Sequence, residues 1–173
     1  MEKQIIINKQ RGFEVVDTKF RTAFHTLTDE KGKKYEIPVD IKLPVRSDVR
    51  SAGYDFFLPK DIIVLPGHKT LIFSDVKAYM QPDEVLQIHI RSSLGIKQGL
   101  ILSNITGIID SSYYSNPDND GNIGLALLNT SGTAIKLREG ERVAQGIFIK
   151  YLTADNDQPT SEERKGGIGS SGK

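Results

Sequence analysis

An aspartate that follows an apolar run is the first candidate for chemistry in this sequence. Gly107, Ile108 and Ile109 lead directly into Asp110, so the carboxylate is expected at the end of a β-strand. A general base or a metal ligand is often mounted at such a position. A turn aspartate that binds nearby backbone N–H groups is the more common alternative. Tyr113 follows on the same loop and could stack on a sugar or a base, or simply cover the core.

A second candidate is a short segment with one arginine and two hydroxyl groups. Arg91, Ser92 and Ser93 follow the apolar run at 85–90 and precede Leu94 and Gly95. The planar guanidinium group suits phosphate oxygens, which it can contact with two parallel N–H donors. A strand-end turn with a surface arginine explains the same five residues equally well.

The last residues form a glycine-rich segment with two serines, residues 166–173. Glycines let backbone N–H groups approach an anion closely, and Ser170 and Ser171 add hydroxyl donors. The segment also matches the start of a P-loop, but the Ser/Thr and the helix that a P-loop needs do not follow Lys173. Taken alone, residues 166–173 are better interpreted as a flexible tail.

Familiar metal sites are not predicted. Residues 116–121 resemble the start of a calcium loop, but the twelfth position, where a bidentate glutamate is needed, is Leu127. A surface turn is the better interpretation. His25, His68 and His89 show no ligand spacing, and the absence of cysteine excludes disulfides and cysteine–metal sites.

Short apolar runs separated by turn residues must position these groups. Seven such runs occur, at residues 5–7, 62–65, 70–73, 85–90, 100–102, 123–128 and 145–149. Pro66-Gly67 and Gln81-Pro82-Asp83 separate some of them as turns. No long stretch has the 3.6-residue period of a helix. The pattern predicts an all-β fold, a barrel or a distorted jelly-roll-like sandwich.

The expected organisation is one β domain with an arm. Residues 1–152 form the domain, which includes an extra N-terminal hairpin at about 22–40, with strands within 26–37 and its turn at 29–32. Residues 153–173 are polar and are expected to form a flexible C-terminal arm.

Composition limits the classes of function. The chain has 173 residues, a formal net charge of +1 and 26% charged residues, which is typical of a globular domain. The near-neutral charge argues against general binding to nucleic acid or to a membrane surface. No apolar run approaches membrane length and the start lacks a signal-peptide core, so a cytoplasmic location is expected.

Together, these segments resemble the five motifs of the homotrimeric dUTPase family, in order. The resemblance covers roughly residues 41–173. The matching segments are Ala52-Gly53-Tyr54-Asp55; Arg91-Ser92-Ser93-Leu94-Gly95; Asn104 with Gly107-Ile108-Ile109-Asp110 and Tyr113; Gly140-Glu141-Arg142-Val143-Ala144-Gln145; and Arg164 with residues 166–172.

The resemblance implies a reaction and an assembly. Asp110 would activate a water that attacks the α-phosphorus of dUTP in line, and dUMP and pyrophosphate would be released. Mg²⁺ would bridge phosphate oxygens, and Asp55 would hold it through water. The reaction limits uracil incorporation into DNA and supplies dUMP for dTTP synthesis. The sites would lie at the interfaces of a homotrimer.

The resemblance also implies the substrate contacts. Asn104, in a hairpin with Gly107 and Ile109, would bind the uracil edge, and Tyr113 would leave no room for a 2′-hydroxyl. The phosphate contacts would come from Arg91, Ser92, Ser93 and Gln145. The closing arm would add Arg164, Ile168, Gly169, Ser170 and Ser171.

Four features depart from the family pattern. Residues 115–120 lengthen the loop before Gly121-Asn122. Ile168 replaces the usual aromatic residue of the fifth motif, so this position would cover uracil with an aliphatic side chain instead of stacking on it. Arg164 is unusually close to Gly166. Residues 1–40 precede the usual start.

Two alternatives remain. A dCTP deaminase shares the fold, but its catalytic glutamate would fall at Ala126, which cannot shuttle a proton. The second alternative is a regulatory function, in which an extra segment such as the hairpin binds a protein partner. Because the motif residues are intact, such binding would add to catalysis.

Overall fold

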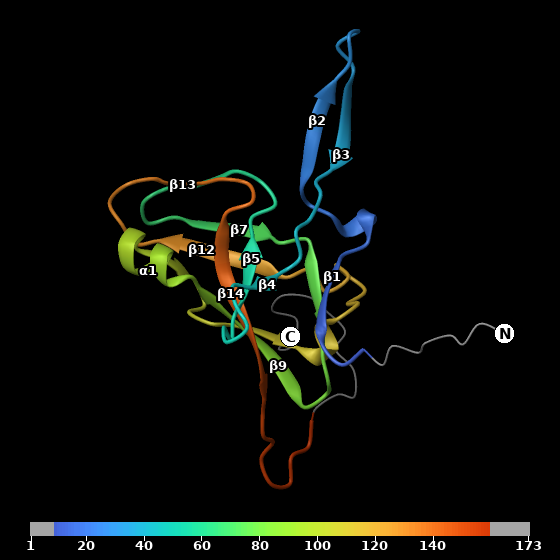
Figure 1. Ribbon diagram of the computed structural model, residues 1–173, viewed down its shortest axis with the longest axis vertical. Coiled ribbons are helices and arrows are strands. Elements are labelled where there is room, and N and C mark those ends of the chain that lie inside the picture. The colour runs from blue at the N-terminus through green and yellow to red at the C-terminus, as the bar shows by residue number, and fades with distance from the viewer. Residues whose placement is uncertain (1–8, 160–173) are drawn as a thin grey trace, which may run out of the picture.

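A computed structural model of the chain describes residues 9–159 and confirms the all-β expectation (Figure 1). Strands make up nearly all of its regular structure, and the one α-helix among these residues, α1, is short. No helix within 9–159 is long and apolar enough to cross a membrane. The strands are β1 Gly12–Val15, β2 Phe24–Thr28, β3 Lys34–Pro38, β4 Val45–Arg46, β5 Tyr54–Phe57, β6 Ile62–Val64, β7 Lys69–Phe73, β8 Val76–Tyr79, β9 Glu84–Ile90, β10 Leu100–Leu102, β11 Gly107–Asp110, β12 Gly124–Asn129, β13 Ile135–Leu137 and β14 Arg142–Lys150.

Antiparallel pairing assembles these strands into several sheets that wrap around one core. The largest sheet has the order β11-β9-β14-β5-β4, and a three-stranded sheet has the order β10-β12-β7. The pairs β1-β8, β13-β6 and β2-β3 complete the sheets. Most neighbouring strands in the two larger sheets are not consecutive in sequence, as in a jelly roll, so residues from distant motifs can meet on one sheet.

The core is formed by alternating side chains of the strands. In β12, Leu125 and Leu127 are buried while their neighbours are partly exposed, which is the period-2 pattern of a strand with one face on the core. In β9 most residues are buried, because this strand lies between β11 and β14. Phe56, Leu86 and Val143 lie within the same apolar cluster, so the five-stranded sheet is anchored to the centre of the molecule.

The runs predicted from the sequence correspond to real strands. Six of the seven apolar runs fall on β6, β7, β9, β10, β12 and β14. The seventh, residues 5–7, lies outside the described residues.

The segment that begins with Ser92 differs from expectation, because it forms the helix α1, Ser92–Gln98, instead of a turn. Gly99 ends this helix in the left-handed conformation, with φ of 70°.

The predicted N-terminal hairpin exists as β2 and β3. Leu27 pairs with Tyr35 and His25 with Ile37, and the turn is closed by the N–H of Gly32, which donates to the carbonyl of Asp29 at 3.0 Å. The hairpin projects away from the rest of the molecule (Figure 1), and both of its strands are exposed throughout.

Candidate active site

The five-stranded sheet brings three of the predicted motifs side by side. In its register, Gln145 of β14 lies between Asp55 of β5 and His89 of β9. Arg91 follows two residues after His89, where β9 ends and α1 begins. The segments that carry the first, second and fourth motifs are separated by tens of residues in sequence, yet the strand register brings them together at one place.

Asp55 is the centre of this group. Its carboxylate is buried, with Oδ1 3.0 Å from Nε of Arg91 and Oδ2 3.1 Å from a terminal nitrogen of Arg142. The hydroxyl of Ser47 also donates to Oδ2 at 3.0 Å. A buried carboxylate needs such partners, because removal from water is costly unless the charge is compensated. Asp55 therefore fixes two guanidinium groups.

A polar cavity of about 300 Å³ opens beside these residues. Its lining includes Asp55, Arg91, Ser92 and Gln145; Ser93 is exposed close by and does not line it. Gly53 also lines the cavity, and a Cβ atom there would lie 2.6 Å from Oε1 of Gln145. A side chain at position 53 would therefore displace the glutamine, which explains the glycine in the first motif.

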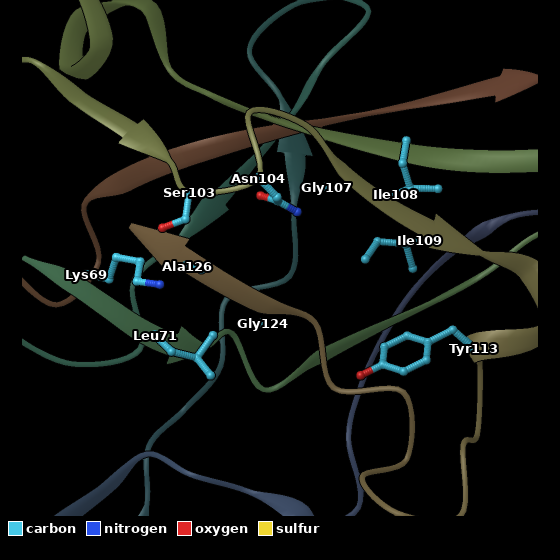
Figure 2. A pocket seen from close by; sticks show the side chains of 10 residues that line it. All are labelled: Lys69, Leu71, Ser103, Asn104, Gly107, Ile108, Ile109, Tyr113, Gly124 and Ala126. Atoms are coloured by element: carbon cyan, nitrogen blue, oxygen red, sulfur yellow. The ribbon is translucent and has the colours of Figure 1, made fainter. Parts of the chain in front are cut away.

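A second, larger cavity of about 480 Å³ is lined by the third motif (Figure 2). Asn104 lies in the tight turn between β10 and β11, where Ile105 has a φ of 65° and its N–H donates to the carbonyl of Leu102. Gly107, Ile109 and Tyr113 line the same cavity. Tyr113 lies on the side of the cavity away from Lys69 (Figure 2).

Asp110 ends β11, so its predicted position at a strand end is confirmed. The side chain is exposed, and the residue begins the 3-10 helix Ser111–Tyr113. It directly follows Ile109, which lines the larger cavity. A carboxylate at this rim is accessible to a water molecule.

Part of the lining of the larger cavity, which we call its floor, comes from residues that the sequence did not indicate. Lys69, Leu71, Gly124 and Ala126 contribute to it from β7 and β12. Leu71 and Ala126 are cross-strand partners, and this register is not readable from either run alone. Ala126, where a deaminase would need its glutamate, thus faces the cavity without a carboxylate.

Several predicted residues fall elsewhere. Arg164, Ile168, Gly169, Ser170 and Ser171 lie outside the described residues. The histidines have no shared site: His25 pairs with Glu139 and His68 with the carbonyl of Pro66. Within 9–159, no three His, Cys, Asp or Glu side chains are grouped to hold a metal ion. Leu127, the twelfth position of the calcium-loop interpretation, is buried in β12.

Comparison with known proteins identifies the family of this chain. The sequence model of the dUTPase family matches residues 39–172. The deoxyuridine 5′-triphosphate nucleotidohydrolase of Lactococcus lactis subsp. lactis is 42% identical over 165 residues, which cover 95% of this chain and 99% of the relative. The protein of the same name from Clostridium tetani is 32% identical over 139 residues, 78% of this chain and 91% of its own.

Solved structures agree with the sequence comparison. The crystal structure of the dUTPase from Streptococcus mutans is 38% identical and superimposes with a TM-score of 0.66, covering 83% of this chain and 98% of that one. The dUTPase of phage phi11 of S. aureus, 18% identical with a TM-score of 0.63 over 88% of this chain and 97% of its own, has a similar fold. The chain belongs to the dUTPase family.

Proposed function

We infer that the chain hydrolyses dUTP to dUMP and pyrophosphate, as a dUTP diphosphatase. The observation that carries this conclusion is the family match over residues 39–172, which includes every residue that lines either cavity. The chemistry of the cavities supports it. One is mainly apolar with an amide at its rim, as a base and sugar require, and the other contains arginine, serine and glutamine, as phosphates require.

Asp110 acts as the general base. Its carboxylate accepts a proton from a water molecule, and the water oxygen forms a bond to the α-phosphorus. The bond from that phosphorus to the bridging oxygen breaks on the opposite side, and its electron pair leaves with pyrophosphate. The exposed position of Asp110 at the end of β11, one residue from the cavity lining, supports this role.

The larger cavity selects the nucleoside. The Asn104 amide can both donate and accept, so it can match the edge of uracil. Its hairpin contains Gly107, whose Cα lies so close to Ile88 that an added Cβ would be 3.1 Å from the Cβ of Ile88. This tight packing holds β11 against β9, and we propose that the hairpin held in this way is too narrow to admit a 5-methyl group. Tyr113 covers the deoxyribose and excludes a 2′-hydroxyl.

The polar cavity binds the phosphates. Because Nε of Arg91 is engaged by Asp55, the terminal amino groups of the guanidinium are the donors that remain for phosphate oxygens. Ser92 and Gln145 add neutral donors, and Ser93 lies next to Ser92 on the exposed side of α1. Residues 164–171 complete the phosphate site in this proposal.

The donor set fits a Mg²⁺ ion that arrives with the substrate. Mg²⁺ keeps several waters and commonly binds one carboxylate plus substrate phosphates. Asp55 offers that carboxylate, because its contacts among the described residues leave one acceptor direction on Oδ1. When bound, Mg²⁺ neutralises charge that develops on the phosphate oxygens.

The two cavities share no lining residue, which supports sites shared between subunits. One chain would supply the nucleoside cavity and a neighbouring chain the phosphate cavity, so we propose a homotrimer with sites at its interfaces. We also propose a cytoplasmic location, where the nucleotide pool and Mg²⁺ are available.

A substrate panel tests the function. The purified protein is incubated with dUTP, dCTP, dTTP or UTP and Mg²⁺, with a parallel series in a chelator, while nucleotide products, pyrophosphate and ammonia are quantified. We expect dUMP and pyrophosphate from dUTP, little product from the other nucleotides and loss of activity without the metal. Release of ammonia from dCTP, or equal hydrolysis of all four, contradicts the proposal.

A further inference from the structure

The inserted loop after the third motif is part of the packed structure. Residues 115–120 lie between Tyr113 and β12, and Asn116 and Asp120 of this loop are buried. Gly121 closes the loop with a φ of +77°, and a Cβ atom there would lie 2.5 Å from the carbonyl oxygen of Tyr113. The insertion therefore folds back on the tyrosine that precedes it.

The contact between them is a hydrogen bond to the tyrosine hydroxyl. Nδ2 of Asn119 donates to the hydroxyl oxygen of Tyr113 at 2.6 Å, and the hydroxyl donates to the carbonyl of Asn122 at 3.2 Å. Oδ1 of Asn119 accepts the N–H of Gly121 at 3.0 Å. Because the amide oxygen is used by a backbone donor, the amide nitrogen must face Tyr113.

We propose that Asn119 is a positioning residue that determines sugar selectivity, because it fixes the ring of Tyr113 against the deoxyribose. This inference rests on the role assigned to Tyr113 under the proposed function. A ring that rejects a 2′-hydroxyl by steric contact must resist displacement. The hydroxyl of Tyr113 is the far end of that ring, so a bond there restrains both ring tilt and translation.

The loop that carries Asn119 is held from the other side. Asp120 pairs with Nζ of Lys77 at 2.8 Å, and both side chains are largely buried. The same carboxylate accepts the N–H of Asp17 at 2.8 Å. Asp17 belongs to the N-terminal segment that precedes residue 39, where the family match begins. The insertion is thus fixed to β8 and to an extra segment of this chain.

A second set of hydrogen bonds anchors Asn122, whose carbonyl accepts the hydrogen bond from the Tyr113 hydroxyl. The side-chain amide of Asn122 donates to Asp75 at 2.9 Å and to the carbonyl of Phe20 at 3.2 Å. Asp75 is fully buried and accepts the backbone N–H groups of Thr22 and Ala23. Asn122 is therefore held by the N-terminal segment, as is the loop that carries Asn119.

The test measures the ratio of kcat/KM for UTP to that for dUTP in the full chain. Asn119→Ala should raise this ratio about fivefold, the factor that one net hydrogen bond contributes. Tyr113→Phe removes the hydroxyl and leaves the loop in place, so it should raise the ratio by a similar factor. The double variant should match Tyr113→Phe alone, because Asn119 acts through that hydroxyl. Asp118→Ala, at an exposed position in the same loop, is the control and should leave the ratio unchanged.

Each failure has a separate meaning. Tyr113→Ala is the reference, and if it does not raise the ratio, the role of Tyr113 in the proposed function is wrong and this inference falls with it. If Tyr113→Ala raises the ratio but Asn119→Ala and Tyr113→Phe do not, the inference alone is overturned. Additive effects in the double variant also overturn it. If Asn119→Ala does not fold, Tyr113→Phe decides the question.

Discussion

Asp55 and Arg91 form an ion pair between a buried carboxylate and a partly exposed guanidinium, with Oδ1 3.0 Å from Nε. The pair joins the first motif to the second and orients the arginine at the edge of the polar cavity. Asp55 is therefore expected to contribute to stability and, under the proposed function, to phosphate binding as well.

Asp55→Asn should lower both stability and affinity. The amide keeps the shape of the side chain but leaves Arg91 and Arg142 without their counter-charge. Because both guanidinium groups are partly exposed, the loss in the free energy of unfolding should be about 1.5 kcal/mol, the low end for hydrogen bonds to charged groups. KM for dUTP should rise because Arg91 is no longer oriented. Thermal unfolding and steady-state kinetics measure the two effects. Arg142→Gln, which removes the more exposed partner, is the control and should cost less. An unchanged Tm and KM for Asp55→Asn would contradict this account.

Asp110→Asn should abolish most turnover while the fold and nucleotide binding remain. The amide has the same size but cannot take a proton from water, and loss of a general base typically costs at least about a hundredfold in rate. Calorimetric titration with a non-hydrolysable dUTP analogue checks binding, and single-turnover kinetics checks chemistry. Asp118→Asn, another exposed acid nearby, serves as the control. Near-normal turnover of Asp110→Asn would remove Asp110 from the mechanism.

Truncation after Glu163 should leave a folded protein with little activity. Residues 164–173 are polar and glycine-rich, so the Tm should match that of the full chain. The glycine N–H groups and the hydroxyls of Ser170 and Ser171 are expected to contact phosphates, so kcat/KM should fall by orders of magnitude. The double variant Ser170→Ala and Ser171→Ala in the full chain should show part of this loss. A truncated protein with normal kinetics would make the fifth-motif match accidental, and one that unfolds would make the segment structural.

Glu84 should make stability depend on acidic pH. Nε and a terminal nitrogen of Arg11 donate to its buried carboxylate, and this hydrogen bonding lowers the pKa of Glu84 below its ordinary value. A lowered pKa in the folded state means that the stabilisation is present above the unfolded pKa, about 4.3, and is lost as the pH falls through the folded value.

Glu84→Gln should therefore be less stable than the wild type at pH 7, and its Tm should fall less between pH 5 and pH 3. Thermal unfolding across this range provides the measurement. Asp83→Asn, an exposed neighbour whose pKa is also lowered, mainly by a hydrogen bond from Lys150, is a comparison with a smaller expected effect. Parallel Tm curves for the wild type and Glu84→Gln would show that the Arg11 contact does not influence stability.

Much of the fold follows from local sequence patterns. The apolar runs became strands because each presents alternating or continuous apolar side chains to one core, and the turn at Asp29–Gly32 closes the hairpin as expected. The helix α1 was missed because its seven residues, with Gly95 among them, are too few to display a helical period. Local patterns thus predict elements better when the element is long or alternates.

The site was predictable as a set of residues but not as a geometry. The motif positions of Asp55, Arg91 and Gln145 indicated a shared site, yet only the strand register places them together. The pairing of Arg142 with Asp55, and the floor formed by Leu71 and Ala126, depend on contacts between distant strands. The hydrogen bond from Asn119 to Tyr113 depends on a loop whose path is set by the N-terminal segment.

The separation of the two cavities has a consequence for genetics. In the homotrimer that we propose, each site is assembled from two chains. An allele that damages only the phosphate cavity, such as Arg91→Ala, should therefore complement an allele that damages only the nucleoside side, such as Asp110→Asn. Mixed assemblies would contain interfaces that combine the intact half of each chain, although each allele alone is inactive. Because each allele damages only one of the two cavities, a defective chain in a mixed assembly should inactivate one site, so activity should fall in proportion to the share of defective chains.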